Sequence, residues 1–198
     1  MEENQRLALK EEFVNLLRSS EREGIEDLIK FLEKSDFYTA PASTRYHGSY
    51  KGGLLEHSLN VYKTLLDVVK LPIFAEKCKD VKFSSLIITA LLHDICKAYY
   101  YAEDTRNVKN KETGQWEQVP YYTVDDKIPY GHGEKSVMII SEFLKLSPEE
   151  KAAIRFHMGF SEPKELYNTL GAAFEKYPLA MALHFSDLIS SHIIEVKE

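Results

Sequence analysis

The sequence predicts an all-α protein, a helical bundle that is interrupted by one β-hairpin. Two observations support this prediction. Apolar residues recur at three- and four-residue spacing along most of the chain, which is the period of an amphipathic helix. Residues 99–130 are instead rich in tyrosine and valine on both sides of a polar turn, a composition that favours strands. With 198 residues, 44% of them hydrophobic, and no repeat or linker, the chain is expected to form one domain, residues 1–198.

The helices follow from the spacing of the apolar residues. The predicted long helices span residues 3–19, 24–34, 54–71, 83–99 and 177–196, and the first two are expected to pack on the rest of the domain as residues 1–34. Pro72 is expected to stop the third helix. A further helix starts at Ser147-Pro-Glu-Glu150, with serine at the N-cap, proline at the first helical position and glutamate at the third. Residues 35–53, which contain Pro41 and three glycines, predict a loop.

The β-prone segment has two possible roles. Its two runs, residues 99–108 and 116–124, flank the turn-forming sequence Lys109-Asn-Lys-Glu-Thr-Gly114. In one interpretation the hairpin overhangs an active site, where its tyrosines, Trp116 and the pair Asp125-Asp126 contact a base or sugar. In the other it packs on the bundle or on a neighbouring subunit. Long insertions beside an active site are often functional.

The sequence Ala90-Leu-Leu-His-Asp-Ile-Cys-Lys97 points to a metal site. It places His93 and Asp94 inside an apolar run that is predicted to be a buried helix. A buried histidine and aspartate are costly unless a partner satisfies them, and a divalent metal ion binds both imidazole nitrogen and carboxylate oxygen. Four other histidines or aspartates lie at helix ends or in apolar segments, namely His57, His132, His157 and Asp187. Helical bundles build metal sites from such inward-facing residues on several helices.

The order His57, His93-Asp94, Asp187 resembles the HD superfamily of metal-dependent phosphohydrolases, which are helical proteins. The resemblance runs from about residue 35 to the C-terminus and implies an HD-domain bundle in which the hairpin is inserted after the HD helix. It also implies one metal ion held by those four residues. His132 and His157 resemble the branch that holds a second metal, which Asp94 would share. That branch often has a double histidine at the later position, where this chain has His157-Met158.

The resemblance also implies a role for Lys97, because the lysine of HD-x-x-Lys points toward the substrate phosphate in that superfamily. Asp94 and Lys97 are therefore the expected catalytic residues. Arg45, Lys51, Lys135 and Arg155 lie near the motifs in sequence and are further candidates for phosphate contacts. His47, His184 and His192 are assigned to no metal, and His184 is expected to pack or to support a ligand.

The function expected from these residues is hydrolysis of a phosphoester or phosphodiester of a nucleotide or a short oligonucleotide. Histidine-rich ligation suits one or two ions of Mn, Fe, Co, Ni or Zn. Two alternatives stay open. The first is a non-catalytic nucleotide-binding regulatory module, and the second is a di-iron oxygenase of the same fold.

Composition limits the partners. The net charge of −6 argues against binding along extended nucleic acid, because phosphate neutralisation needs clustered lysine and arginine. No apolar run approaches the ~20 residues of a membrane span, and the polar N-terminus does not resemble a signal peptide. Two cysteines, Cys78 and Cys96, are too few for a disulfide framework. We therefore expect a cytoplasmic protein without a membrane partner. The aromatic hairpin and the first helix are possible contact surfaces of a homo-oligomer.

Overall fold

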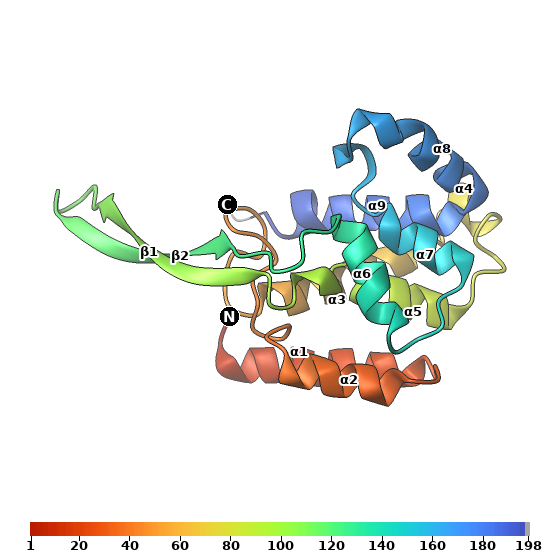
Figure 1. The fold of residues 1–198 in the computed structure, drawn as a ribbon, viewed down its shortest axis with the longest axis horizontal. Helices are drawn as coiled ribbons and strands as arrows, with labels where there is room; N and C mark the ends of the chain where they lie inside the picture. The colour runs from red at the N-terminus through yellow and green to blue at the C-terminus, as the bar shows by residue number, and fades with distance from the viewer. Residues whose placement is uncertain (197–198) are drawn as a thin grey trace.

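The structure is a computed structural model that describes residues 1–196. Figure 1 shows a helical body from which one β-hairpin projects, and the all-α prediction with a hairpin is confirmed. Short 3₁₀ turns at Ile95–Lys97, Gly159–Ser161 and Lys164–Leu166 and a π-helical turn at Ser190–Ile194 connect or extend the helices. The α-helices of the described residues are α1 (Glu3–Ser19), α2 (Ile25–Lys34), α3 (Gly53–Val68), α4 (Pro72–Ala75), α5 (Phe83–Leu92), α6 (His132–Ser141), α7 (Pro148–Arg155), α8 (Tyr167–Lys176) and α9 (Pro178–Ile189).

Helix α3 lies at the centre of the body. It packs against α5 on one side and α9 on the other, while α1 and α2 cover the bundle from below in Figure 1. The core is formed by fully buried leucines and isoleucines, among them Leu54, Leu65, Ile88 and Leu183. Helix α7 contacts α5, α6 and α9. Residues of these helices that lie at one end of the bundle are therefore close together, although they are far apart in the sequence.

The chain departs from the predicted helix at the His93-Asp94 pair. Helix α5 ends at Leu92, and residues 95–97 form a 3₁₀ turn instead of continuing the α-helix to residue 99. Tertiary contacts explain the break, because the backbone N–H of Cys96 donates to Ser136 Oγ of α6 at 3.2 Å. Tyr99 then adopts a left-handed conformation with φ of 58°, which turns the chain into the hairpin.

Three other predicted boundaries also differ. Helix α3 ends at Val68, and Pro72 starts the short helix α4, where its fixed φ suits the first helical position. The last predicted helix begins at Pro178 and changes to a π-helical turn after Ile189. Helix α8 was not predicted. Its Asn168, Thr169 and Gly171 are weak helix formers, and the burial of Leu170 and Phe174 stabilises it instead.

The predicted hairpin is confirmed, but most of it does not cover the helical body. Strands β1 (Tyr101–Lys109) and β2 (Trp116–Val124) pair antiparallel, with Tyr101 opposite Val124 and Lys109 opposite Trp116. Figure 1 shows the turn pointing away from the helices, and Trp116 is 70% exposed. The base of the hairpin lies on the body, where the Tyr101 hydroxyl donates to the Ala42 carbonyl at 3.1 Å. Trp116 and the turn therefore lie away from the helices, and the part of the hairpin from its base to the middle of the strands is placed to contact a ligand beside the body.

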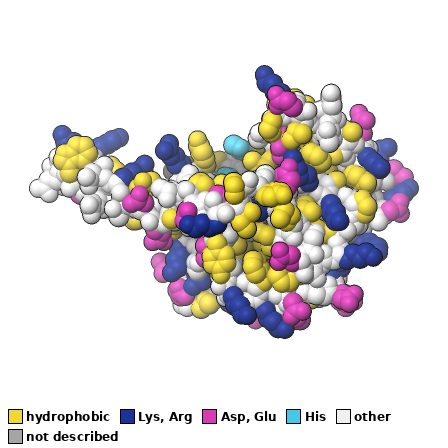
Figure 2. Space-filling view, viewed as in Figure 1, with side chains coloured by type: hydrophobic (Ala, Val, Ile, Leu, Met, Phe, Trp, Pro, Cys, Tyr) yellow, Lys and Arg dark blue, Asp and Glu magenta, His cyan; other side chains and the backbone are white. Residues whose placement is uncertain are grey.

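Charged side chains of both signs alternate over the face seen in Figure 2. Among residues 1–196, no helix has both the length and the apolar composition needed to cross a bilayer.

The predicted helix start at Ser147 is confirmed, and it contains a buried ion pair. Ser147 and Glu150 form a reciprocal capping box, and the Glu150 side chain is only 1% exposed. Its carboxylate also accepts hydrogen bonds from Arg22 Nη1 at 2.5 Å and from Ser85 Oγ at 2.8 Å. Burial raises the pKa of Glu150, but these hydrogen bonds outweigh burial and hold the pKa below its usual value.

Substituting Glu150→Gln should therefore remove a stabilisation that depends on pH. A lowered pKa in the folded state stabilises the protein above the unfolded-state pKa, and this contribution disappears as the pH falls through the folded value. Urea unfolding at pH 7 should show a loss of about 1–3 kcal/mol in the variant. The difference from the wild type should shrink toward pH 3. Glu23→Gln, which changes an exposed glutamate, is the control, and equal pH dependence in wild type and Glu150→Gln would contradict this interpretation.

Candidate metal centre

The six predicted ligands converge at one end of the bundle. His57 lies in the first turns of α3, His93 and Asp94 follow α5, and Asp187 lies on α9. His132 starts α6 and His157 follows α7. Histidine side chains are visible in Figure 2 in the hollow where the hairpin joins the helical body.

Two glycines permit this convergence. A Cβ on Gly53 would lie 1.9 Å from the carbonyl oxygen of Gly48, so only glycine lets the loop approach the start of the helix that carries His57. A Cβ on Gly133 would lie 2.1 Å from the carbonyl oxygen of Arg155. This close approach of α6 to α7 brings His132 and His157 to the same carboxylate.

Asp94 is the centre of the cluster, and its two oxygens face different histidines. Oδ2 lies 3.5 Å from His93 Nε2 and 3.8 Å from His57 Nε2. Oδ1 lies 3.4 Å from His157 Nε2 and 3.8 Å from His132 Nε2. The set is completed by Asp187, whose Oδ1 lies 3.2 Å from His57 Nε2. Asp94, His57, His93 and His157 are almost fully buried.

Hydrogen bonds at the far side of each ring orient three of the histidines. The Nδ1 atoms of His93 and His157 lie 2.8 Å and 2.7 Å from the carbonyl oxygens of Ala90 and Ile154. A carbonyl only accepts, so each Nδ1 carries the proton and each Nε2 presents a lone pair to the cluster. His57 Nδ1 lies 3.1 Å from both carboxylate oxygens of Glu195. Metal-binding histidines are oriented by such partners.

A metal ion fits this arrangement. Asp94 Oδ1 and His157 Nε2 are buried without a hydrogen-bond partner among the described residues, although they face each other. Leaving such atoms unsatisfied is costly, and a shared cation would remove the cost. Donors that share an ion at about 2.1 Å lie about 3.0–3.4 Å apart for angles between square and tetrahedral. The 3.3 Å between His57 Nε2 and His93 Nε2 falls within this range.

The ionisation state differs among the residues of the cluster. Burial lowers the pKa of His93 and of His132 to about 4, so both rings are neutral at pH 7. Burial opposes ionisation of Asp94, but the charge of Lys97 outweighs it and holds the pKa of this carboxyl well below its usual value. Burial likewise lowers the pKa of His57, and its hydrogen bonds with Asp187 and Glu195 outweigh burial and raise the pKa to about 10. In the metal-free site His57 is therefore protonated at pH 7, and a metal ion bound at its Nε2 would displace this proton.

A small pocket of about 170 Å³ opens onto the cluster. Lys97 lines it, and its ammonium lies 2.6 Å from Asp94 Oδ2. The pocket is also lined by three histidines that are not expected to bind metal, His47, His184 and His192. The His184 ring stacks on Phe174 with centroids 5.8 Å apart, and its Nδ1 lies 2.8 Å from the His157 carbonyl oxygen, as its predicted packing and supporting roles require.

Two further residues, Glu195 and Asn60, join the site without having been predicted from the sequence. Glu195 follows the π-helical turn after α9, and it accepts hydrogen bonds from His57 Nδ1 and, at 2.9 Å, from Asn60 Nδ2. No local pattern in the sequence marks this contact, because it depends on how the C-terminal turn packs beside α3.

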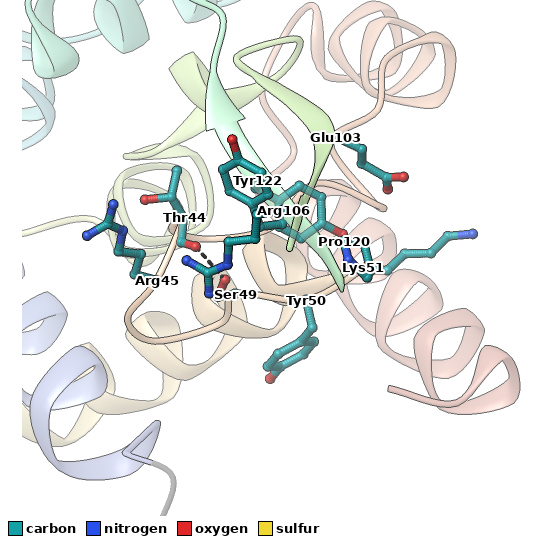
Figure 3. Close-up of a pocket in the computed structure, with 10 residues that line it drawn as sticks. Thr44, Arg45, Ser49, Tyr50, Lys51, Glu103, Arg106, Pro120 and Tyr122 are labelled. Carbon is teal, nitrogen blue, oxygen red and sulfur yellow. Dashed lines mark hydrogen bonds between the residues drawn. The ribbon is translucent and has the colours of Figure 1, made fainter. Parts of the chain in front are cut away.

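The other four residues that were predicted to contact phosphate lie in two different environments. Lys135 donates to Asp126 at 2.5 Å, and Arg155 pairs with Glu134 and, at 2.6 Å, with Glu162. Both residues are thus neutralised by carboxylates and do not line the pocket. Arg45 and Lys51 line a second cleft beside the hairpin, which Figure 3 shows.

Comparison with known proteins finds similarity over part of the chain. No protein-family model matches the chain, and no solved structure matches it significantly. A segment of 89 residues is 36% identical to dihydroneopterin 2′,3′-cyclic phosphate phosphodiesterase of Methanocaldococcus jannaschii. This segment covers 43% of the chain and 31% of that relative. The chain is therefore similar to part of a phosphodiesterase and spans less than a third of the length of that relative.

Replacement of Glu195 should weaken metal binding. In Glu195→Gln the partner of His57 Nδ1 loses its charge, and loss of such a supporting carboxylate typically costs about 10–100-fold in metal affinity. Competition with a chromophoric chelator measures the affinity for Mn(II) and Zn(II) in wild type and variant. Glu175→Gln, an exposed change on α8, serves as the matched control. Equal affinities in wild type and Glu195→Gln would show that Glu195 does not support the site.

Proposed function

We propose that this protein is a metal-dependent phosphohydrolase of the HD type, which cleaves a phosphoester or phosphodiester of a nucleotide or short oligonucleotide. The observation that carries the proposal is the position of Asp94, whose two oxygens face two separate pairs of histidines. The similarity of part of the chain to a phosphodiesterase also supports it.

The donor set suits two ions that share Asp94. His57, His93, Asp94 and Asp187 would hold one ion, and Asp94, His132 and His157 would hold the other. Mixed imidazole and carboxylate ligation suits Mn, Fe, Co, Ni or Zn. When bound, such ions polarise phosphate oxygens and activate a water as the nucleophile.

The remaining residues of the pocket position the phosphate. Lys97 keeps its positive charge, because the Asp94 carboxylate outweighs the effect of burial and raises the pKa of the ammonium group. Its ammonium faces the pocket beside Asp94, where it would neutralise charge that develops on the phosphate in the transition state. At about 170 Å³ the pocket is smaller than the 300–1,000 Å³ typical of small-molecule sites. It therefore suits the phosphate group, and the rest of the substrate would lie outside it.

Removal of the metal should abolish activity. Hydrolysis of bis(p-nitrophenyl) phosphate, measured by release of p-nitrophenolate, should disappear after EDTA treatment and return on addition of Mn(II). Asp94→Asn should lower kcat by about a thousandfold or more, because two ions would lose a shared charged ligand. The control is Asp80→Asn, an exposed change remote from the cluster. Full activity in EDTA or in Asp94→Asn would contradict the proposal.

Substitution of Lys97 should lower the turnover rate without changing the metal content. Lys97→Gln keeps a hydrogen-bond donor but removes the charge, and kcat should fall by about 100-fold, as for other groups that stabilise transition-state charge. Metal content, measured on the same preparation, should stay at the wild-type level and shows that the site is intact. Unchanged kcat with normal metal content would exclude a role for Lys97 at the phosphate.

A further inference from the structure

A second cleft of about 550 Å³ lies between the loop before α3 and the hairpin. Arg45 and Lys51 line it from the loop, and Arg106 and Tyr121 line it from β1 and β2. Glu103 is the one carboxylate in its lining. Three cations and one carboxylate form a locally positive site on a chain whose net charge is −6. Its size falls within the 300–1,000 Å³ range of small-molecule sites.

The cations of this cleft lack the partners that neutralise cations elsewhere. The side chains of Arg45, Lys51 and Arg106 form no ion pair or hydrogen bond with any of residues 1–196. Lys135 and Arg155, by contrast, are both paired with carboxylates. Arginine binds phosphate oxygens through several donors at once, so unpaired arginines in a cleft favour a phosphate ligand.

The cleft also offers a surface for a base. The Arg106 guanidinium lies over the Tyr121 ring, 5.4 Å from its centroid, and Tyr122 lines the cleft as well. Figure 3 shows Arg45 and Arg106 on one side of the cleft with Thr44 and Ser49, whereas Lys51 and Glu103 extend to the other side. Proteins that bind single-stranded nucleic acid combine such cations with aromatic rings on which bases stack.

The same loop connects the cleft to the metal centre. His47 lines the pocket over the metal ligands, and its ring centroid lies 4.9 Å from that of His57. Arg45 is two residues away in sequence, so its Cα is at most about 7 Å from that of His47. The base of the hairpin completes the connection, because the Tyr100 ring lies 5.7 Å from the His132 ring.

We propose that this cleft binds a second phosphate of the substrate together with its adjoining base, so that the substrate is a short single-stranded oligonucleotide. This inference rests on the proposed phosphohydrolase function, because it places the scissile phosphate in the pocket at Asp94. Arg45 and Arg106 bind the neighbouring phosphate, and Tyr121 stacks on the base. The bound oligonucleotide continues along the base of the hairpin. Because the oligonucleotide is short, its binding does not need a basic stripe over the whole surface of the protein.

The test compares a substrate that reaches the cleft with one that does not. In the double variant Arg45→Gln/Arg106→Gln, kcat/KM for a trinucleotide should fall about tenfold or more, because two charged hydrogen-bonding partners are lost. Bis(p-nitrophenyl) phosphate has no second phosphate, and its hydrolysis should stay within about twofold of the wild type. The control is Lys109→Gln, which removes a cation from the same strand as Arg106 but outside the cleft.

Binding gives a second readout that does not need turnover. Fluorescence anisotropy of a labelled trinucleotide on metal-free protein should show weaker binding in the double variant than in the wild type and in Lys109→Gln. Equal affinity, or an equal loss of activity on both substrates, would overturn the proposal. Absence of hydrolysis in every protein, with the affinity difference intact, would overturn the phosphohydrolase function but support the cleft as a nucleotide site. Inorganic triphosphate, which has no base, should compete only weakly with the labelled trinucleotide, and competition as strong as that of an unlabelled trinucleotide would overturn the role of the base.

Discussion

Burial of the Asp94 carboxylate among four imidazole rings is the constraint on which the site depends. A charged group in such a place needs compensation, and Lys97 supplies it on one oxygen only. The other oxygen has no hydrogen-bond partner among the described residues and faces His132 and His157. His93 and His157 in turn direct Nε2 toward the carboxylate, because backbone carbonyls accept hydrogen bonds from their Nδ1 atoms, and Glu195 orients His57 through its Nδ1. A divalent cation satisfies all of these requirements together.

The helical bundle is arranged so that this constraint is met. Central helix α3 packs between α5 and α9, and each of the three contributes ligands directly or at its end. Gly133 lets α6 and α7 approach closely enough for their histidines to share Asp94. The 3₁₀ turn after Leu92 has a similar function, since it turns Asp94 and Lys97 toward the same pocket. Irregular backbone is thus concentrated where the chemistry is proposed to occur.

Much of this arrangement could be predicted from the sequence, and the rest depends on contacts between distant residues. Helical periodicity gave α1 and α2 to within a residue, and apolar surroundings marked His93 and Asp94 as unusual. The end of α5 could not be predicted, because it is determined by a hydrogen bond to Ser136. Glu195 joins the site only through the packing of a C-terminal turn beside α3. Arg45 and Arg106 lie 61 residues apart in the chain and line one cleft only because the hairpin folds beside the loop.

The most direct test of the account is the metal content of the purified protein, measured by inductively coupled plasma mass spectrometry for wild type and His132→Ala after reconstitution with Mn(II). A shared Asp94 predicts about two ions per chain in the wild type and about one in the variant, since only one of the two sites would lose a ligand. One ion in both proteins would contradict the shared site. No ion in either protein would contradict the proposed metal-dependent function as a whole.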